Sequence, residues 1–260
     1  LDGLVGADGL AAVLAVEHGD GQAPAALTGD APVGALADHA LHAVDAPARH
    51  PAHIVARGAG LVLEGIDGAG TSTQINILKE KKEAERFFFT AEPTDSPTGK
   101  FLRTVLKGNV ELDPRTSAYL FAADRAEHLW GKSGSNCGIE KKCSDGKIVI
   151  SDRYFFSSLT YQSVTCGEEL PRLLNSAFPL PQILFFFKIS PEISLKRVDA
   201  RGEREIYEKI DFLQATEERY EKLMDEYEAK NTGMKIVRLD AAKSKEEVSA
   251  QIWQELSKLL

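Results

Sequence analysis

The stretch GIDGAGTSTQ, Gly65 to Gln74, has the spacing of a phosphate-binding loop. In the consensus G-x-x-x-x-G-K-[ST], Gly65, Gly70 and Ser72 are in register, but Thr71 stands where the consensus has lysine. Glycines and the start of a following helix can bind an anion through backbone N–H groups without that lysine, and the Ser72 hydroxyl can bind Mg²⁺. The alternative is a glycine-rich turn that binds no phosphate.

Two further segments carry groups suited to phosphoryl transfer. Asp152-Arg153-Tyr154 follows an apolar run, so Asp152 could hold magnesium while Arg153 binds phosphate oxygens. The alternative is an ion pair at the end of a strand. The charged segment from Asp199 to Glu205 contains Gly202 and two arginines, Arg201 and Arg204, which could close over phosphates as a flap. A solvated run of charges is an equally good interpretation of this segment alone.

Phe121 and Arg125 are four residues apart in a stretch that we expect to be helical, so they share one face. An aromatic ring with a guanidinium group can hold a flat base by stacking and hydrogen bonding. Taken alone, the pair also fits a core phenylalanine beside a solvated arginine.

Five short apolar runs are typical of buried strands: Leu61–Glu64, Arg86–Thr90, Lys147–Ser151, Ile183–Phe187 and Lys235–Leu239. Helical patterns lie between and after them, over Ser72–Glu85, Ser96–Leu106, Pro114–Trp130, Phe155–Ser163, Pro191–Ala200, Tyr207–Lys230 and Ser244–Leu259. This alternation predicts an α/β fold with a parallel sheet covered by helices on both faces. Ligands of such sheets bind where strands end, and the first three strands run into the loop at Gly65, into Glu92-Pro93 and into Asp152.

The composition narrows the class of protein. The chain has 260 residues and a formal net charge of −8, which argues against a general nucleic-acid or membrane binder. No apolar run approaches the roughly 20 residues of a membrane-spanning helix. The three cysteines, Cys137, Cys143 and Cys166, form no C-x-x-C pair, so we expect free thiols in a reducing compartment.

The N-terminal segment differs from the rest. Residues 1–57 are rich in Ala, Gly and His and contain no aromatic residue other than histidine, so they have little with which to build a core. We expect a flexible extension, followed by a working domain over 58–260. The spacings His39-x-x-His42 and His50-x-x-His53 would suit metal ligands, but no carboxylate or thiolate cluster accompanies them.

Taken together, the motifs of residues 61–260 resemble those of the thymidylate kinases, nucleoside-monophosphate kinases of the P-loop class. The likeness rests on LEGIDGAG, on Glu92-Pro93, on FAADRAEH, on Asp152-Arg153-Tyr154, on ISPEISLKR and on the arginine flap with Tyr207-Glu208-Lys209, all in the family's order. It implies a P-loop kinase fold with a five-stranded parallel sheet. It also implies transfer of the γ-phosphoryl group of ATP to dTMP with Mg²⁺, usually by a cytoplasmic homodimer.

The resemblance also implies a role for individual residues. The loop residues Gly65, Asp67, Gly68, Ala69, Gly70, Thr71, Ser72 and Thr73 would hold the ATP phosphates, and Ser72 and Asp152 the metal. The dTMP site would comprise Asp67 at the 3′-hydroxyl, Phe121 stacked on thymine, Arg125 at its edge, Arg103 and Arg153 at the phosphate, Tyr161 and Gln162 beside sugar and base, and Glu92 with Pro93. Asp152, Arg153, Arg201 and Arg204 would be catalytic.

The sequence departs from the family pattern at three positions. Thr71 replaces the loop lysine, and Ala91 and Ile206 stand where basic residues are common. Each change removes a positive charge near phosphates, which the remaining arginines would have to replace. A catalytically weakened nucleotide-binding protein, or a kinase of another nucleoside monophosphate, therefore remains the alternative.

Overall fold

The computed structural model describes residues 60–132, 138–200, 202 and 205–260. The expected extension over residues 1–57, with its histidines, lies outside these residues, and so do the expected domain start at 58, Cys137, Arg201 and Arg204.

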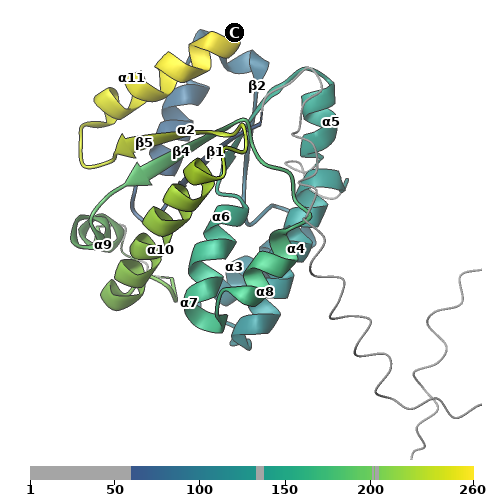
Figure 1. The fold of residues 1–260 in the computed structure, drawn as a ribbon, viewed down its shortest axis with the longest axis vertical. Coiled ribbons are helices and arrows are strands. Elements are labelled where there is room, and N and C mark those ends of the chain that lie inside the picture. Colours follow the sequence, from purple (N-terminus) through teal and green to yellow (C-terminus); the bar gives the residue numbers. More distant parts are fainter. Residues whose placement is uncertain (1–59, 133–137, 201, 203–204) are drawn as a thin grey trace, which may run out of the picture. The chain divides into compact units, whose positions relative to one another are not determined.

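The described part of the chain is built around one five-stranded parallel sheet (Figure 1). Its strands are β1 (Gly60–Gly65), β2 (Phe87–Ala91), β3 (Ile148–Asp152), β4 (Ile183–Lys188) and β5 (Lys235–Asp240), in the order β2-β3-β1-β4-β5. All five expected strands are confirmed. The central strands β1, β3 and β4 are almost wholly buried, as near-continuous apolar sequences require in a sheet covered on both faces.

Helices cover both faces of the sheet, with α2 and α11 on one side and α10 on the other (Figure 1). The longer helices are α2 (Thr71–Lys79), α3 (Pro97–Leu106), α4 (Pro114–Trp130), α9 (Pro191–Asp199), α10 (Ile210–Ala229) and α11 (Lys245–Leu256). The shorter ones are α5 (Ile139–Ser144), α6 (Phe155–Ser157), α7 (Ser163–Cys166) and α8 (Glu169–Asn175), with 3₁₀ turns η2 (Lys82–Arg86) and η4 (Ser257–Leu259) and a π-helical turn η3 (Ser158–Gln162). The expected capping box of Ser244 and Glu247 is present at the start of α11.

Two expected helices are wrong in their extent. The helix expected over Ser72–Glu85 ends at Lys79, because Leu78 is the last side chain that it buries and charged residues follow. The helix expected over Phe155–Ser163 is interrupted by η3, where Thr160 donates its hydroxyl hydrogen to the carbonyl groups of Phe156 or Ser157. All five residues of η3 are buried, and π-helical turns of this kind are frequent at functional sites.

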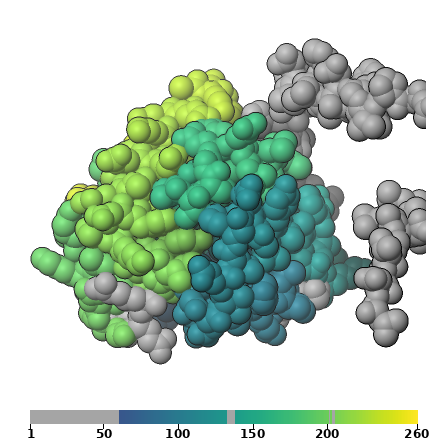
Figure 2. Space-filling view, turned by 90° about the horizontal axis from the view of Figure 1, so that it is seen from below, coloured from purple at the N-terminus to yellow at the C-terminus, as the bar shows by residue number. Residues whose placement is uncertain are grey.

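The remaining differences concern shorter segments. The helix expected from Tyr207 begins at Ile210, and α5 and α8 were not expected. Backbone contacts join segments far apart in sequence: the Ile206 amide donates to the Leu106 carbonyl at 3.0 Å, so the residues before α10 lie beside the end of α3. On the face drawn in Figure 2, blue and teal residues from the middle of the described chain lie beside green residues that come later in the sequence.

The core contains side chains from every strand, including Leu61, Leu63 and Phe185 to Phe187, all at most 1% exposed. Within the described ranges, no helix is both long enough and apolar enough to cross a membrane.

Candidate active site

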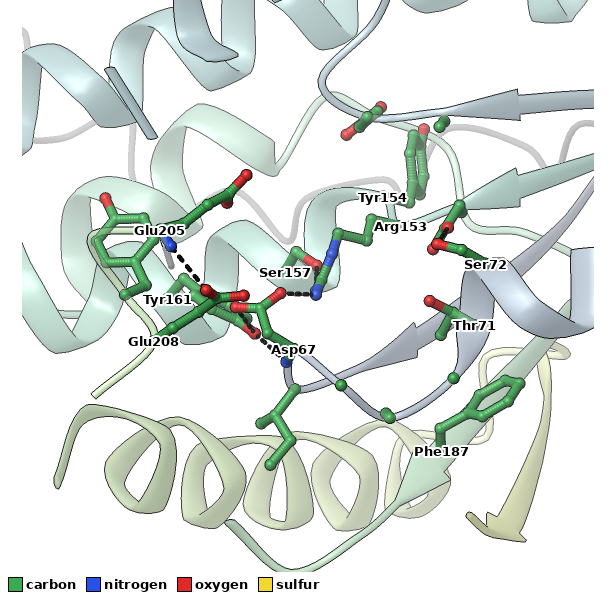
Figure 3. Close-up of a pocket in the computed structure, with 18 of the residues that line it drawn as sticks. Asp67, Thr71, Ser72, Arg153, Tyr154, Ser157, Tyr161, Phe187, Glu205 and Glu208 are labelled. Carbon is green, nitrogen blue, oxygen red and sulfur yellow. Dashed lines mark hydrogen bonds and ion pairs between the residues drawn. The ribbon is translucent and has the colours of Figure 1, made fainter. Parts of the chain in front are cut away.

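A cleft of about 1030 Å³ opens where the strands end. The pairing of β3 with β1 and β2 sets Asp152 opposite both Leu63 and Ala91, so the segments that follow β1, β2 and β3 start side by side. The expectation that these three ends meet at one edge is therefore confirmed. All described candidate residues line the cleft except Gly65, and Figure 3 shows several of them around it.

The loop after β1 has the backbone of an anion-binding turn. Gly68 and Gly70 adopt φ angles of 80° and 101°, which other residues rarely adopt, and α2 begins at Thr71 directly after them. The first N–H groups of a helix have no partner within it and carry its positive dipole end. Backbone donors therefore converge at this point of the cleft without a lysine.

Helix α9 packs against the loop after β1 and holds it in place. A Cβ on Gly68 would lie 2.6 Å from the Ser194 carbonyl oxygen, so only glycine lets α9 approach this closely. The Ser194 hydroxyl donates to the Asp67 carbonyl, and Arg197 donates to the carbonyl groups of Gly68 and Ala241. Gly65 is the one candidate that does not line the cleft. This position also requires glycine, because a Cβ there would lie 2.9 Å from the Phe187 carbonyl oxygen.

Ser72 and Asp152, the two residues that we expect to hold a metal, lie in contact. The Ser72 hydroxyl donates to Asp152 Oδ2 at 2.6 Å (Figure 3), whereas the buried Asp152 Oδ1 has no hydrogen-bond partner among the described residues. A hydroxyl and a carboxylate oxygen without a partner are the ligand types that Mg²⁺ prefers. No group of three or more His, Cys, Asp or Glu side chains suited to a metal occurs in the described ranges. The residues therefore fit a magnesium ion that takes its other ligands from water and phosphate.

Arg153 is held in a fixed position beside the loop. Its φ of 71° is unusual for a residue with a Cβ, and its amide donates to the Leu63 carbonyl at 2.9 Å. Its Nη1 donates to the Gly65 carbonyl and to Ser157 Oγ, and its Nη2 pairs with Asp67 (Figure 3). The ion pair of Arg153 is therefore not a local pair at the end of its own strand. It joins the segment after β3 to Asp67 in the loop after β1.

Glu64, in β1 directly before the loop, has a fully buried side chain. It accepts hydrogen bonds from the Tyr154 and Ser157 amides, from Ser157 Oγ at 2.7 Å and from the Tyr220 hydroxyl at 2.8 Å. Burial raises the pKa of Glu64 to about 7, against the opposing effects of Arg153 and these donors. Sequence reasoning missed this residue, although its place directly before Gly65 was part of the motif.

The residues that we expect to bind dTMP all line the cleft. Arg103 donates to the Pro93 carbonyl, Phe121 is partly exposed, and Tyr161 donates to Asp67 Oδ2 at 3.1 Å. Gln162 also lines the cleft and is buried. Arg125 is not the solvated arginine of the alternative interpretation, since only 1% of it is exposed.

Arg201 and Arg204, the two arginines expected in a flap, lie outside the described residues, but the structure describes the residues from Glu205 onward. Glu205, Tyr207 and Glu208 line the cleft, and the Glu205 amide donates to Glu208 Oε2 at 2.6 Å (Figure 3). Burial, and then the charges of Asp67 and Glu208, raise the pKa of Glu205. Two acidic side chains, Glu205 and Glu208, therefore line the cleft.

Sequence reasoning also missed the residues that follow β4 and β5. Phe187 at the end of β4, Ala241 after β5, and Lys243 and Lys245 before and at the start of α11 all line the cleft. The rule that ligands bind at strand ends would have found them, had it been applied to all five strands.

Comparison with known proteins agrees with this geometry. The family model that matches is described as thymidylate kinase and covers residues 63–252. A Treponema pallidum relative is 38% identical over 198 residues, 75% of this chain and 93% of its own length. Relatives from Methanocaldococcus jannaschii and Pyrobaculum aerophilum are 39% and 36% identical over 64% and 74% of this chain and 82% and 93% of their own lengths. All three carry names that give thymidylate kinase as an inferred activity. The chain therefore belongs to the thymidylate kinase family.

Proposed function

We propose that this protein transfers the γ-phosphoryl group of ATP to dTMP, giving dTDP and ADP. The observation that carries the proposal is the placement of two sets of groups around one cleft. Ser72 and Asp152 lie at the phosphate-binding loop, and Arg103 and Arg153 line the same cleft. In the reaction, an oxygen of the acceptor phosphate bonds to the γ-phosphorus while the bond to the bridging oxygen of ADP breaks.

Arg153 is the residue best suited to bind the acceptor phosphate. Its hydrogen bonds to Gly65, Ser157 and Asp67 hold the guanidinium group in place at the edge of the cleft. A fixed guanidinium group presents adjacent N–H donors, which match two phosphate oxygens. Asp67 and Tyr161, already bonded to each other, would present the carboxylate to the deoxyribose 3′-hydroxyl.

On the ATP side, the turn from Gly68 to Ser72 would bind the phosphates through backbone N–H groups. Ser72 and Asp152 would hold Mg²⁺, which neutralises phosphate charge when bound. Thr71 supplies a hydroxyl but no charge. Arg201 and Arg204 remain our candidates to replace the missing lysine, and the described residues add Lys243 and Lys245, which line the cleft.

Further parts of this proposal follow the family pattern: a homodimer in the cytoplasm, with residues 58–260 as the working domain. The experiment is a coupled measurement of ADP release with dTMP, dUMP, dCMP and AMP in parallel. Turnover should be greatest with dTMP. The preference over dUMP should be modest, because one methyl group contributes only about 1–3 kcal/mol. Equal turnover of AMP and dTMP would refute the proposal.

A further inference from the structure

The buried side chain of Glu64, near the end of β1, contacts two other segments. Its Oε1 accepts from the Tyr154 amide at 2.7 Å and from the Ser157 amide at 3.3 Å. Its Oε2 accepts from the Ser157 hydroxyl at 2.7 Å and from the Tyr220 hydroxyl at 2.8 Å. The carboxylate therefore joins β1 to the segment after β3 and to helix α10.

Tyr220 brings a fixed donor to this carboxylate. Its side chain is 0% exposed. Its ring stacks on Phe186 of β4, with the two ring centres 5.5 Å apart, and meets the ring of Tyr161 edge to face at 6.4 Å. Rings that are packed in this way cannot turn freely, so the position of the Tyr220 hydroxyl is set by the packing of α10 on the sheet.

Glu64 also helps to hold the backbone of Arg153. The φ of Arg153, 71°, lies in the left-handed region that residues with a Cβ rarely adopt. The Arg153 amide donates to the Leu63 carbonyl at 2.9 Å, and the next amide, that of Tyr154, donates to Glu64 Oε1. Two consecutive residues of β1 therefore bind the amides on either side of the Arg153 Cα. Unusual backbone conformations persist only where surrounding contacts hold them in this way.

The side chain of Arg153 is linked to Glu64 through Ser157. Arg153 Nη1 donates to Ser157 Oγ at 3.1 Å and to the Gly65 carbonyl at 2.9 Å, and Nη2 pairs with Asp67 (Figure 3). Gly65 and Asp67 lie at and after the end of β1, whereas Ser157 lies in α6. Because the Ser157 hydroxyl directs its one hydrogen to Glu64, its oxygen is left to accept from Arg153. Glu64 thereby orients the hydroxyl that Arg153 contacts.

We propose that Glu64 is a positioning residue for phosphoryl transfer, which holds Arg153 at the edge of the cleft through the Tyr154 amide and the Ser157 hydroxyl. This inference deepens the proposed function and rests on it. Glu64 is 0% exposed and does not line the cleft, so it acts through Arg153 and not by touching a nucleotide. A purely structural role and a positioning role differ in one respect. Only the second makes the effect of Glu64 on the rate depend on the presence of Arg153.

The first measurement compares kcat for dTMP, and KM for dTMP and for ATP, in the full chain and in Glu64→Leu and Ser157→Ala. Both variants should lower kcat by about tenfold to a hundredfold, since misplacing a catalytic group by about 1 Å can cost about 10²-fold. KM for ATP should not change. Glu64→Gln keeps an acceptor for the two backbone amides and polar hydrogens for the two hydroxyl groups, so it should retain most of the parent kcat.

The second measurement repeats Glu64→Leu and Ser157→Ala in the Arg153→Ala variant. Neither should lower the residual kcat further, because no guanidinium group remains to be positioned. Structural damage would instead lower kcat by the same factor in both backgrounds. Thr216→Val is the matched control, since it removes a buried hydroxyl of α10 that donates to the Phe212 carbonyl at 2.8 Å. It should leave kcat unchanged in both backgrounds.

Two results would overturn the inference. One is a parent-like kcat in Ser157→Ala and in folded Glu64→Leu, and where Glu64→Leu fails to fold, a parent-like kcat in Ser157→Ala alone is sufficient. The other is an equal fold loss of kcat with and without Arg153, which would assign a purely structural role. Failure of the parent protein to form dTDP from dTMP would instead refute the proposed function, so the two failures are distinguishable.

Discussion

Replacing Glu64 by Gln should change how the stability of the protein depends on pH. Glu64 is fully buried, and its pKa is raised from the ordinary 4.5 to about 7. Folding therefore favours the protonated form. The stability that this group contributes is fully present below pH 4.5 and is lost as the pH rises through about 7. This rise in the pKa of Glu64, from 4.5 to about 7, corresponds to about 3 kcal/mol of the free energy of unfolding.

Glutamine imitates the protonated form at every pH. Its carbonyl oxygen can accept from the Tyr154 and Ser157 amides, and its amide can donate to the hydroxyl groups of Ser157 and Tyr220. The free energy of unfolding of Glu64→Gln, minus that of the parent, should therefore rise by about 3 kcal/mol between pH 4.5 and 8. Near pH 4.5 the two proteins should be similarly stable.

The assay is equilibrium unfolding in urea at several pH values, with equal m-values required for the comparison. Glu226→Gln is the matched control. Arg172 first, and then Lys230, lower the pKa of Glu226 to about 2, so its contribution is present above pH 4.5 and is lost only as the pH falls toward 2. Its difference from the parent should stay constant between pH 4.5 and 8. A constant difference for Glu64→Gln as well would refute the burial argument.

Three further predictions concern catalysis and organisation. Arg153→Ala should lower kcat by about 10²-fold or more, because a fixed arginine on the acceptor phosphate acts mostly in the transition state; near-normal kinetics would show that the site is misplaced. Arg201→Ala or Arg204→Ala should reduce turnover much more than ATP affinity, and Thr71→Lys should restore turnover in these variants while changing the parent little; lack of any effect of both arginines on the rate would show that they do not replace the missing lysine. Deletion of residues 1–57 should preserve Tm and dTMP turnover, and loss of either would show that the extension packs on the core.

The sheet was predictable because its signal is local. Each strand is a short apolar run, and the alternation of runs with helical patterns allows few arrangements other than a covered parallel sheet. The meeting of Gly65, Ala91 and Asp152 at one edge then follows from parallel pairing alone. The glycine-rich turn between β1 and α2 was predictable for the same reason, since its spacing is contiguous.

Features that depend on tertiary contacts were not predictable. Nothing in the sequence around Glu64 indicates that Tyr220, 156 residues later, donates to it. The same holds for the three hydrogen-bond partners of Arg125, which are Glu92, Asn175 and Ser158 and come from three segments. They bury a side chain that, from the sequence alone, also fitted a solvated arginine. The interruption at η3 also depends on burial of the whole turn, which no periodicity reports.

The central claim is tested most directly by incubating the full chain with ATP, Mg²⁺ and dTMP and measuring dTDP and ADP separately. We predict that both products form in equal amounts, and that neither forms at a comparable rate without dTMP. If both nucleotides bind but no dTDP appears, or if ADP accumulates at the same rate without dTMP, the claim is contradicted. The chain would then be a nucleotide-binding relative that has lost the transfer reaction.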